Sequence, residues 1–221
     1  QMTKSNNKIN QPEPFGGQLE GKEGEILRAA YRCIVERGIA ATTTHAVAER
    51  AGMNQGSIHY YFRSKDALLE RLLEELYENS MNNIRIVARS DKTPKEKITS
   101  ILSRGSSLAG SRKDELIVFF AFWAHAMSLG GRWRQLYIEL FRKFRGTIVA
   151  ILQEGEWSHF NIMGGEEAVA SLIVATVQGL GLQYIMDPAA VRQSDLDAAL
   201  NDLFDNVLIG EGTLQERRVV S

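Results

Sequence analysis

The spacing of apolar positions along the chain predicts a protein built from α-helices. Apolar residues recur three and four positions apart, as Ile26, Leu27, Ala30 and Ile34 do, which is the period of a helix with one buried face. Polar, glycine or proline residues separate the periodic segments. The nine helices expected from this pattern cover residues 22–38, 45–51, 55–61, 64–89, 95–109, 114–129, 132–154, 165–186 and 195–209.

Residues typical of helix ends support the first of these boundaries. The run Thr42-Thr43-Thr44 offers hydroxyl caps for the second helix, Asn54 offers one for the third and Ser64 one for the fourth. Gly52 is expected to end the second helix, and Thr93-Pro94 to begin the fifth. Two short helices joined by a tight turn that contains glycine are typical of a helix-turn-helix, which places its second helix in the major groove of DNA.

The segment from Gly38 to Leu68 resembles the DNA-binding domain of the TetR family of bacterial transcriptional regulators. The positions that carry the resemblance are Gly38, Ala41-Thr42-Thr43, Val47-Ala48, Ala51-Gly52, Gly56, Ile58, Tyr61-Phe62, Lys65 and Leu68. Three positions depart from the family pattern: Ile39 replaces an aromatic residue, Thr44 an apolar one, and His59 a tyrosine that often touches a phosphate. The resemblance implies a DNA-binding domain followed by a helical domain for ligand binding and dimerisation.

The candidate DNA contacts lie in the second and third helices and at the start of the fourth. Amide, hydroxyl and imidazole groups on the third helix are candidates for base edges, and a basic or hydroxyl group near a helix start is a candidate for a phosphate. The predicted DNA-binding residues are Thr43, His45, Asn54, Gln55, Gly56, Ser57, His59, Tyr60 and Lys65. For Thr43 the alternative is an ordinary helix cap, for His45 and Lys65 a surface residue, and for Gly56 a packing requirement. Tyr61 and Phe62 are predicted to hold the third helix against the fourth.

Aromatic residues concentrate in the second half of the chain. The helix over 114–129 is apolar on two faces and is therefore predicted to be buried. A ligand cavity combines apolar walls with a few polar groups. The predicted pocket residues are Trp123, His125, Trp133, Tyr137, Phe141, Gln178 and Gln183. The alternative is a solid aromatic core.

The last two helices are predicted to form a homodimer. Residues 168–184 combine apolar stripes with Ala, Ser and Gly, which allow close approach between helices, and apolar residues line one face of the final helix. The predicted interface residues are Leu172, Thr176, Gly179, Leu200, Leu203, Phe204 and Val207. The TetR resemblance implies the same location. The stretch from Gly179 to Pro188, together with the helix that contains Phe122 and Trp123, is similar to the BetI-type branch of the family.

Composition and charge limit the functional classes. The 221 residues carry a net charge of −1, but residues 1–65 hold nine Lys/Arg against six Asp/Glu, a mild positive excess in the predicted DNA-binding part. One cysteine, Cys33, excludes an intramolecular disulfide and is expected to be buried. The four histidines lack the spacing of metal ligands, so no metal site is expected. No nucleotide-binding or nucleophile motif is present, so we expect neither a cofactor nor enzymatic activity. The sequence contains no uninterrupted run of eighteen apolar residues, so a membrane span is not expected. A cytoplasmic location is expected.

These observations predict an all-α chain of four parts. They are a flexible arm over 1–21, a helix-turn-helix domain over 22–65, a connecting helix and linker over 66–93, and a regulatory and dimerisation domain over 94–221. The protein is predicted to be a dimeric transcriptional regulator that binds a palindromic operator. It is expected to act as a repressor, and a small molecule is expected to release it from the DNA. Two alternatives stay open: a DNA-binding regulator without an effector, and a helical ligand-binding protein that has lost DNA binding.

Overall fold

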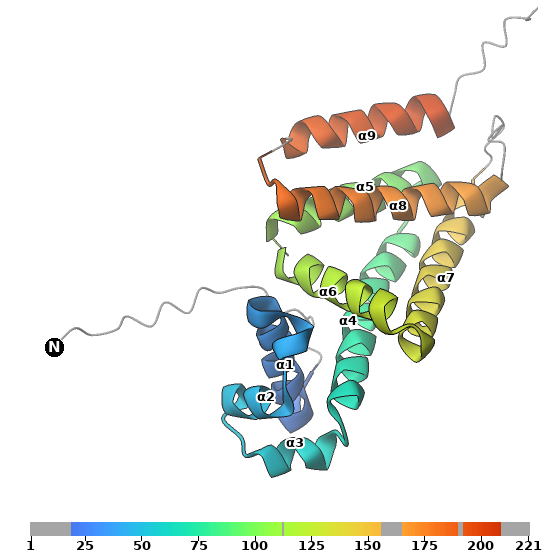
Figure 1. Ribbon diagram of the computed structural model, residues 1–221. Helices are drawn as coiled ribbons and strands as arrows, with labels where there is room; N and C mark the ends of the chain where they lie inside the picture. Colours follow the sequence, from blue (N-terminus) through green and yellow to red (C-terminus); the bar gives the residue numbers. More distant parts are fainter. Residues whose placement is uncertain (1–18, 112, 156–164, 190–191, 209–221) are drawn as a thin grey trace, which may run out of the picture. The chain divides into compact units, whose positions relative to one another are not determined.

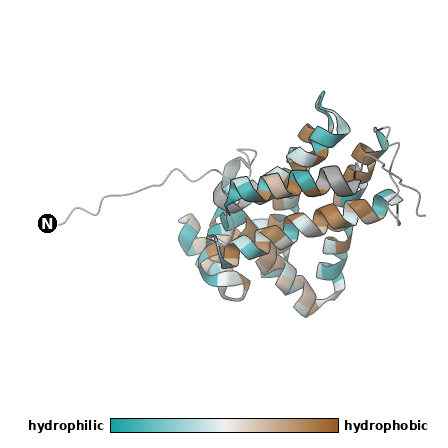
Figure 2. Ribbon diagram, turned by 90° about the horizontal axis from the view of Figure 1, so that it is seen from above, coloured by the Kyte–Doolittle hydropathy of each residue, from teal (hydrophilic) through white to brown (hydrophobic). Residues whose placement is uncertain are grey.

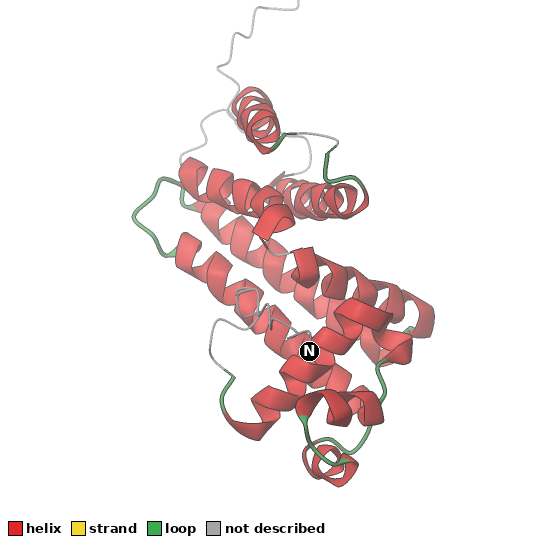
Figure 3. Ribbon diagram, turned by 90° about the vertical axis from the view of Figure 1, so that its left-hand side faces the viewer, coloured by secondary structure: helices red, strands yellow, loops and turns green. Residues whose placement is uncertain are grey.

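The computed structural model describes residues 19–111, 113–155, 165–189 and 192–208, and within these the side chains of 105–111 and 204–208 are not described. Within these ranges every regular element is an α-helix (Figure 3). The predicted all-α fold is therefore confirmed. The helices are α1 Gly21–Ala41, α2 Thr44–Ala51, α3 Gln55–Tyr61, α4 Lys65–Ala88, α5 Pro94–Ser111, α6 Lys113–Leu129, α7 Gly131–Gln153, α8 Gly165–Met186 and α9 Gln193–Leu208 (Figure 1). Most of the predicted N-terminal arm lies outside the described residues.

The end of α1 differs from the prediction. The expected end at Gly38 is a kink, where the glycine takes φ +75° and ψ 170°, and a further short turn continues to Ala41. Positive φ is a conformation that glycine adopts without steric cost. The glycine thus interrupts the helix, and the chain resumes helical geometry after it.

The predicted caps form hydrogen bonds, with one refinement. The Thr43 hydroxyl accepts the amide of Ala46 at 3.1 Å, and the Ser64 hydroxyl accepts the amide of Ala67 at 3.1 Å. Of Thr42, Thr43 and Thr44, Thr43 is the cap of α2, and Thr44 is the first residue of the helix. Thr42 is buried, and its hydroxyl donates to the carbonyl of Gly38 at 2.8 Å.

A reciprocal cap opens α5. The amide of Thr93 donates to the carboxylate of Glu96 at 2.8 Å, while the amide of Glu96 donates to the Thr93 hydroxyl at 3.3 Å. The bonds from the Thr93 amide and hydroxyl lower the pKa of the Glu96 carboxyl, because they stabilise its charged form.

This pair gives a testable pH dependence. Because the folded-state pKa is lowered, its contribution to stability is present above the pKa of the unfolded chain and is lost as the pH falls through the folded-state value. The variant Thr93→Ala removes the hydroxyl but keeps the amide, so we expect the pKa of Glu96 to rise part of the way to its ordinary value. Carboxyl carbon NMR over an acid titration measures both proteins. An unchanged pKa in the variant would show that the hydroxyl contributes nothing.

The described chain divides into two compact units. The first contains residues up to Asn79 together with Ile117–Phe122, and the second contains Ser80–Leu116 and the chain from Trp123 onward. The helix α4 therefore contributes residues to both units. In the first unit α1 contacts α2, and α2 contacts α3. Its fully buried large side chains are Ile26, Leu27, Ile34, Ile58, Leu68, Leu69, Leu72 and Phe122.

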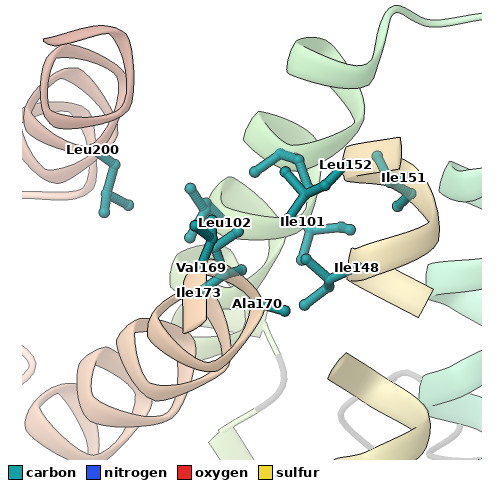
Figure 4. Close-up of a cluster of buried hydrophobic side chains, with 10 residues drawn as sticks. Ile101, Leu102, Ile148, Ile151, Leu152, Val169, Ala170, Ile173 and Leu200 are labelled. Carbon is teal, nitrogen blue, oxygen red and sulfur yellow. The ribbon is translucent and has the colours of Figure 1, made fainter. Parts of the chain in front are cut away.

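The core of the second unit is formed by α5, α7, α8 and α9 (Figure 4). Side chains of α5, α7 and α8 meet at its centre, and Leu200 reaches it from α9. The core residues are Ile98, Ile101, Leu102, Ile148, Ile151, Leu152, Val169, Ala170, Ile173 and Leu200. Beside them the buried ammonium of Lys97 pairs with the carboxylate of Glu154 at 2.5 Å, which links α5 to the end of α7.

The prediction that the helix over 114–129 is buried is wrong at its C-terminal end. Val118, Phe122 and Ala126 of α6 are buried, but Met127 is 73% exposed and Leu129 is 58% exposed. An apolar composition favours burial, yet only packed neighbours provide it, and in the last turn Ala126 has such neighbours whereas Met127 and Leu129 face solvent.

The helix α8 is long and apolar enough to cross a membrane, although no uninterrupted apolar run marked it as a span. Such a helix is weak evidence for a membrane protein, because the core helix of a soluble protein passes the same test. Hydrophobic and hydrophilic residues are interleaved along the helices (Figure 2). In α8 one side contributes Val169, Ala170 and Ile173 to the core, while Leu172 and Met186 are exposed.

Candidate nucleic-acid interface

The turn between α2 and α3 has the geometry of a helix-turn-helix. Gly52 ends α2 in the left-handed conformation, with φ +65°. The amide of Met53 then donates to the carbonyl of Ala48 at 2.9 Å, which closes the end of α2 in a Schellman-type arrangement. Asn54 follows directly as the cap of α3, so only three residues separate the two helices.

One face of α3 is anchored and the other is free for contact. Ile58 is fully buried, and Phe62, just after the helix, is 5% exposed. Gln55 and His59 are exposed on the helix, and Tyr60 is 85% exposed. Tyr60 therefore presents its ring and its hydroxyl to solvent.

The start of α3 is organised by Asn54. Its side-chain oxygen accepts the amide of Ser57 at 2.8 Å and the hydroxyl of Ser57 at 3.1 Å. A Cβ added to Gly56 would lie 3.2 Å from the same oxygen. Gly56 therefore leaves room for the cap, which is a packing reason for the glycine. The amide nitrogen of Asn54 keeps its donors for another partner.

Removing this cap is expected to weaken α3. The variant Asn54→Ala should lower the free energy of unfolding by about 1 kcal/mol, the usual cost of losing a helix N-cap. Denaturant unfolding measures the change, and Asn54→Asp is the matched control because its carboxylate can accept the same amide. Equal stability of the alanine and aspartate variants would contradict the capping role.

The N-terminus of α2 presents further polar groups. Thr43 and His45 are exposed. The Thr43 hydroxyl accepts one amide, and its own O–H is available to donate. The first amides of a helix also lack partners within the helix, which makes this end suited to an anion such as a phosphate.

A shallow hollow beside α3 brings in a residue that the sequence analysis did not select. The hollow has a volume of about 470 Å³ and is lined by Lys22, Met53, Asn54, Gly56, Ser57, Tyr60 and Tyr61. Lys22 belongs to the first turn of α1 and reaches this surface only through the packing of the three helices. Tyr61, predicted to hold α3 in place, is 42% exposed and meets the ring of Tyr60 edge to face at 5.2 Å, so the buried anchor is Phe62.

Lys65, a predicted phosphate contact, has partners inside the domain. Its ammonium donates to the carbonyls of Ile39 at 2.7 Å and Ala40 at 3.1 Å, at the end of α1. The side chain is half-buried. The sequence contains no local signal for these bonds, because twenty-five residues or more separate the partners.

Comparison with known proteins agrees with this geometry. Residues 26–72 match the family model "Bacterial regulatory proteins, tetR family", and residues 94–208 match "BetI-type transcriptional repressor, C-terminal". The chain belongs to the TetR family. TetR-family proteins are transcriptional regulators that bind DNA and often bind small molecules. Members of this family are generally not enzymes.

Three distant relatives match this chain over nearly their whole length. The TetR-family chain is 25% identical over 199 residues to the HTH-type transcriptional regulator PksA of Bacillus subtilis. The alignment covers 90% of this chain and 96% of PksA. The fold is similar to a putative transcriptional regulator from Saccharomonospora viridis in complex with choline (TM-score 0.72, 22% identity, 83% of this chain and 95% of the other). It is also similar to FadR from Bacillus subtilis in complex with stearoyl-CoA (TM-score 0.67, 22% identity, 86% of this chain and 100% of the other).

The predicted pocket residues of this TetR-family chain lie in the second unit and differ in exposure. Trp133 and Tyr137 are buried, at 6% and 4% exposed, and burial raises the pKa of the Tyr137 phenol far above its ordinary value. Their rings meet His125 at 4.9 Å and Phe141 at 5.8 Å, both edge to face. Trp123 and Gln178 are half-buried, and Gln183 is exposed.

The predicted dimer residues are also divided. Leu172 is 62% exposed and Leu203 is 56% exposed, while Leu200 is 8% exposed and packs in the core of its own chain. Thr176 and Gly179 are half-buried. The side chains of Phe204 and Val207 lie outside the described part of α9.

Proposed function

We propose that two copies of this protein bind a palindromic operator and repress transcription until a small-molecule effector releases them. The observation that carries the proposal is the surface around α3, which is anchored by Ile58 and Phe62 and exposes Gln55, His59 and Tyr60 on its other side. A short, fixed helix with exposed amide and imidazole groups suits a major groove.

Base recognition falls mainly to Gln55 and His59 in this proposal. The side-chain oxygen of Asn54 is engaged in the cap, and the hydroxyl of Ser57 donates to it. The amide of Gln55 can pair with adenine in two hydrogen bonds, and an imidazole can donate to or accept from a base edge. Thr43, His45 and Tyr60 are the proposed phosphate contacts, and Lys22 is added to them from the hollow beside α3.

An exposed apolar stripe on α8 supports the dimer. Leu172, Ala175, Leu182 and Met186 are exposed, and Gly179 lies in register with them, at spacings of three and four residues. Such a stripe covers one helix face along nearly its whole length. Pairing with the same helix of a second copy would remove this face from water, and a two-fold dimer presents two recognition helices to a two-fold site.

Selection on random duplexes tests the DNA-binding part. The purified protein would be taken through rounds of binding to random-sequence duplexes at moderate salt, and the enriched sites read. We expect a palindrome whose half-sites are centred about one helical turn, roughly 34–36 Å, or a small multiple of it apart. A non-palindromic consensus would contradict the two-fold arrangement. Absence of enrichment, repeated with added cell extract to supply any corepressor, would favour a ligand-binding protein without DNA binding.

The proposed effector acts through α4. This helix belongs to the first unit up to Asn79 and to the second from Ser80, so it connects the two parts covalently and without a break. A ligand bound in the second unit near Trp123, His125 and Gln178 would release DNA only if it binds the DNA-incompetent state more tightly.

A regulator without an effector is the second candidate, and the packing of the aromatic residues favours it. Trp133 and Tyr137 are buried and make ring contacts within the chain, as residues of a solid core do. Titration of the operator complex with choline and with stearoyl-CoA, the molecules bound by two structural neighbours, begins the test. Release by a small molecule, with a matching rise in the melting temperature of the free protein, would support the effector proposal. Unchanged operator affinity across a wider metabolite set would support the second candidate.

A further inference from the structure

The end of α1 presents carbonyl groups that need donors from outside the helix. The last carbonyls of a helix have no partner within it and take their donors from following residues, side chains or water. The Thr42 hydroxyl donates to Gly38, the amide of Thr42 donates to Ile39 at 3.1 Å, and the amide of Thr43 donates to Ala41 at 3.0 Å. Thr42 and Thr43, which directly follow α1, thus donate hydrogen bonds to three of its last carbonyls.

Lys65 supplies the donors that this segment does not. Its ammonium bonds to the carbonyl of Ala40 at 3.1 Å and shares the carbonyl of Ile39 at 2.7 Å. A charged donor makes a stronger hydrogen bond than a neutral one, and a cation is favoured at the carbonyl end of a helix.

The position of Lys65 is itself well determined. It is the first residue of α4, directly after the capping Ser64, and Leu68 and Leu69 of the next turn are buried in the core of the first unit. The ammonium therefore connects a fixed helix start to the segment that leads into α2. Thr43, the cap of α2, follows Ala40 by three residues.

We propose that Lys65 is a positioning residue, which sets the DNA-contacting start of α2 by holding the end of α1 and makes no contact with DNA itself. This inference rests on the DNA-binding function proposed above but differs from the phosphate contact that the sequence suggested. A phosphate contact and a positioning role both predict weaker DNA binding without the lysine. They differ in salt dependence and in what happens in the absence of DNA.

Hydrogen exchange of the free protein tests the internal role. In Lys65→Met we expect the hydrogen-bonded amides of Thr42, Thr43, Ala46 and Val47 to exchange about tenfold faster, because charge-assisted hydrogen bonds worth roughly one such factor are lost. The amides of Ile26 and Leu27, in the same unit, are expected to keep their rates. In Lys65→Arg the guanidinium can reach both carbonyls, so most of the protection should return. The matched control is Arg63→Met, which removes one positive charge from an exposed side chain two residues away and should leave these amides unchanged.

Salt dependence of DNA binding tests the second half of the proposal. Each phosphate contact contributes about 0.9 to the slope of log affinity against log salt concentration. For Lys65→Met on a duplex that carries the selected operator, we expect about tenfold weaker binding with the wild-type slope, since no phosphate contact is lost.

Three results would overturn the proposal. A slope lowered by about one would show that the ammonium does touch a phosphate. Unchanged exchange at Thr42, Thr43, Ala46 and Val47 would show that the two carbonyl bonds do not stabilise the start of α2. Faster exchange throughout the unit, Ile26 and Leu27 included, would show a general role in folding. If the wild-type protein binds no duplex, the proposed function fails, while the exchange experiment still decides whether Lys65 holds the start of α2.

Discussion

Replacing Ile151 with alanine is expected to lower the free energy of unfolding of the second unit by about 2–5 kcal/mol, the range for removing a large aliphatic side chain from a core. Ile151 lies on α7, is fully buried, and belongs to the cluster that joins α5, α7, α8 and α9. The loss combines the transfer of the removed methylene and methyl groups with the cavity that they leave. Urea unfolding followed by circular dichroism gives the change in free energy.

The control for this prediction lies on the same helix. Ile138 of α7 is 39% exposed, so the same substitution there removes less buried surface and should cost below about 1 kcal/mol. Both variants carry the same change of helix propensity, which cancels in the comparison. Equal losses at the two positions would mean that the cluster around Ile151 does not hold the unit together.

Introducing a glutamate at Leu172 is expected to separate the proposed dimer and to weaken operator binding at least about 100-fold. A charge placed within an apolar interface loses its hydration without gaining a partner. A monomer also loses the second half-site, and joining two binding modules commonly raises affinity by about 10²–10⁴. Light scattering after size exclusion gives the mass, and fluorescence anisotropy on the selected duplex gives the affinity.

Ile86 provides a control with the same exposure. Leu172 on α8 and Ile86 on α4 are both 62% exposed, so Ile86→Glu adds the same charge to an equally accessible apolar position outside the stripe on α8. We expect this variant to stay dimeric. A Leu172→Glu protein that keeps the dimer mass would contradict the proposed interface, whereas loss of the dimer in both variants would indicate a wider contact surface.

The sequence by itself determined the helices, most of their ends and the family. The caps at Thr43, Asn54, Ser64 and Thr93 were predictable because each bond joins groups three residues apart, so a short stretch of sequence contains both partners. Gly52 ended α2 for the same local reason, since its left-handed conformation depends on that residue alone. The register of these residues also carried the TetR resemblance, which the family comparison confirmed.

Only the tertiary structure decided where long side chains end and which apolar residues are covered. Lys65 bonds to carbonyls of α1, and Lys22 lies beside α3. Leu200 packs in the core of the second unit. Each of these contacts forms because helices distant in sequence pack against one another. The helical period assigns a residue to a face but does not say which neighbour covers that face, so Met127 was expected to be buried and is exposed. Hydrogen bonds between near neighbours are written in the local sequence, whereas burial and long-range bonds depend on how the whole chain packs.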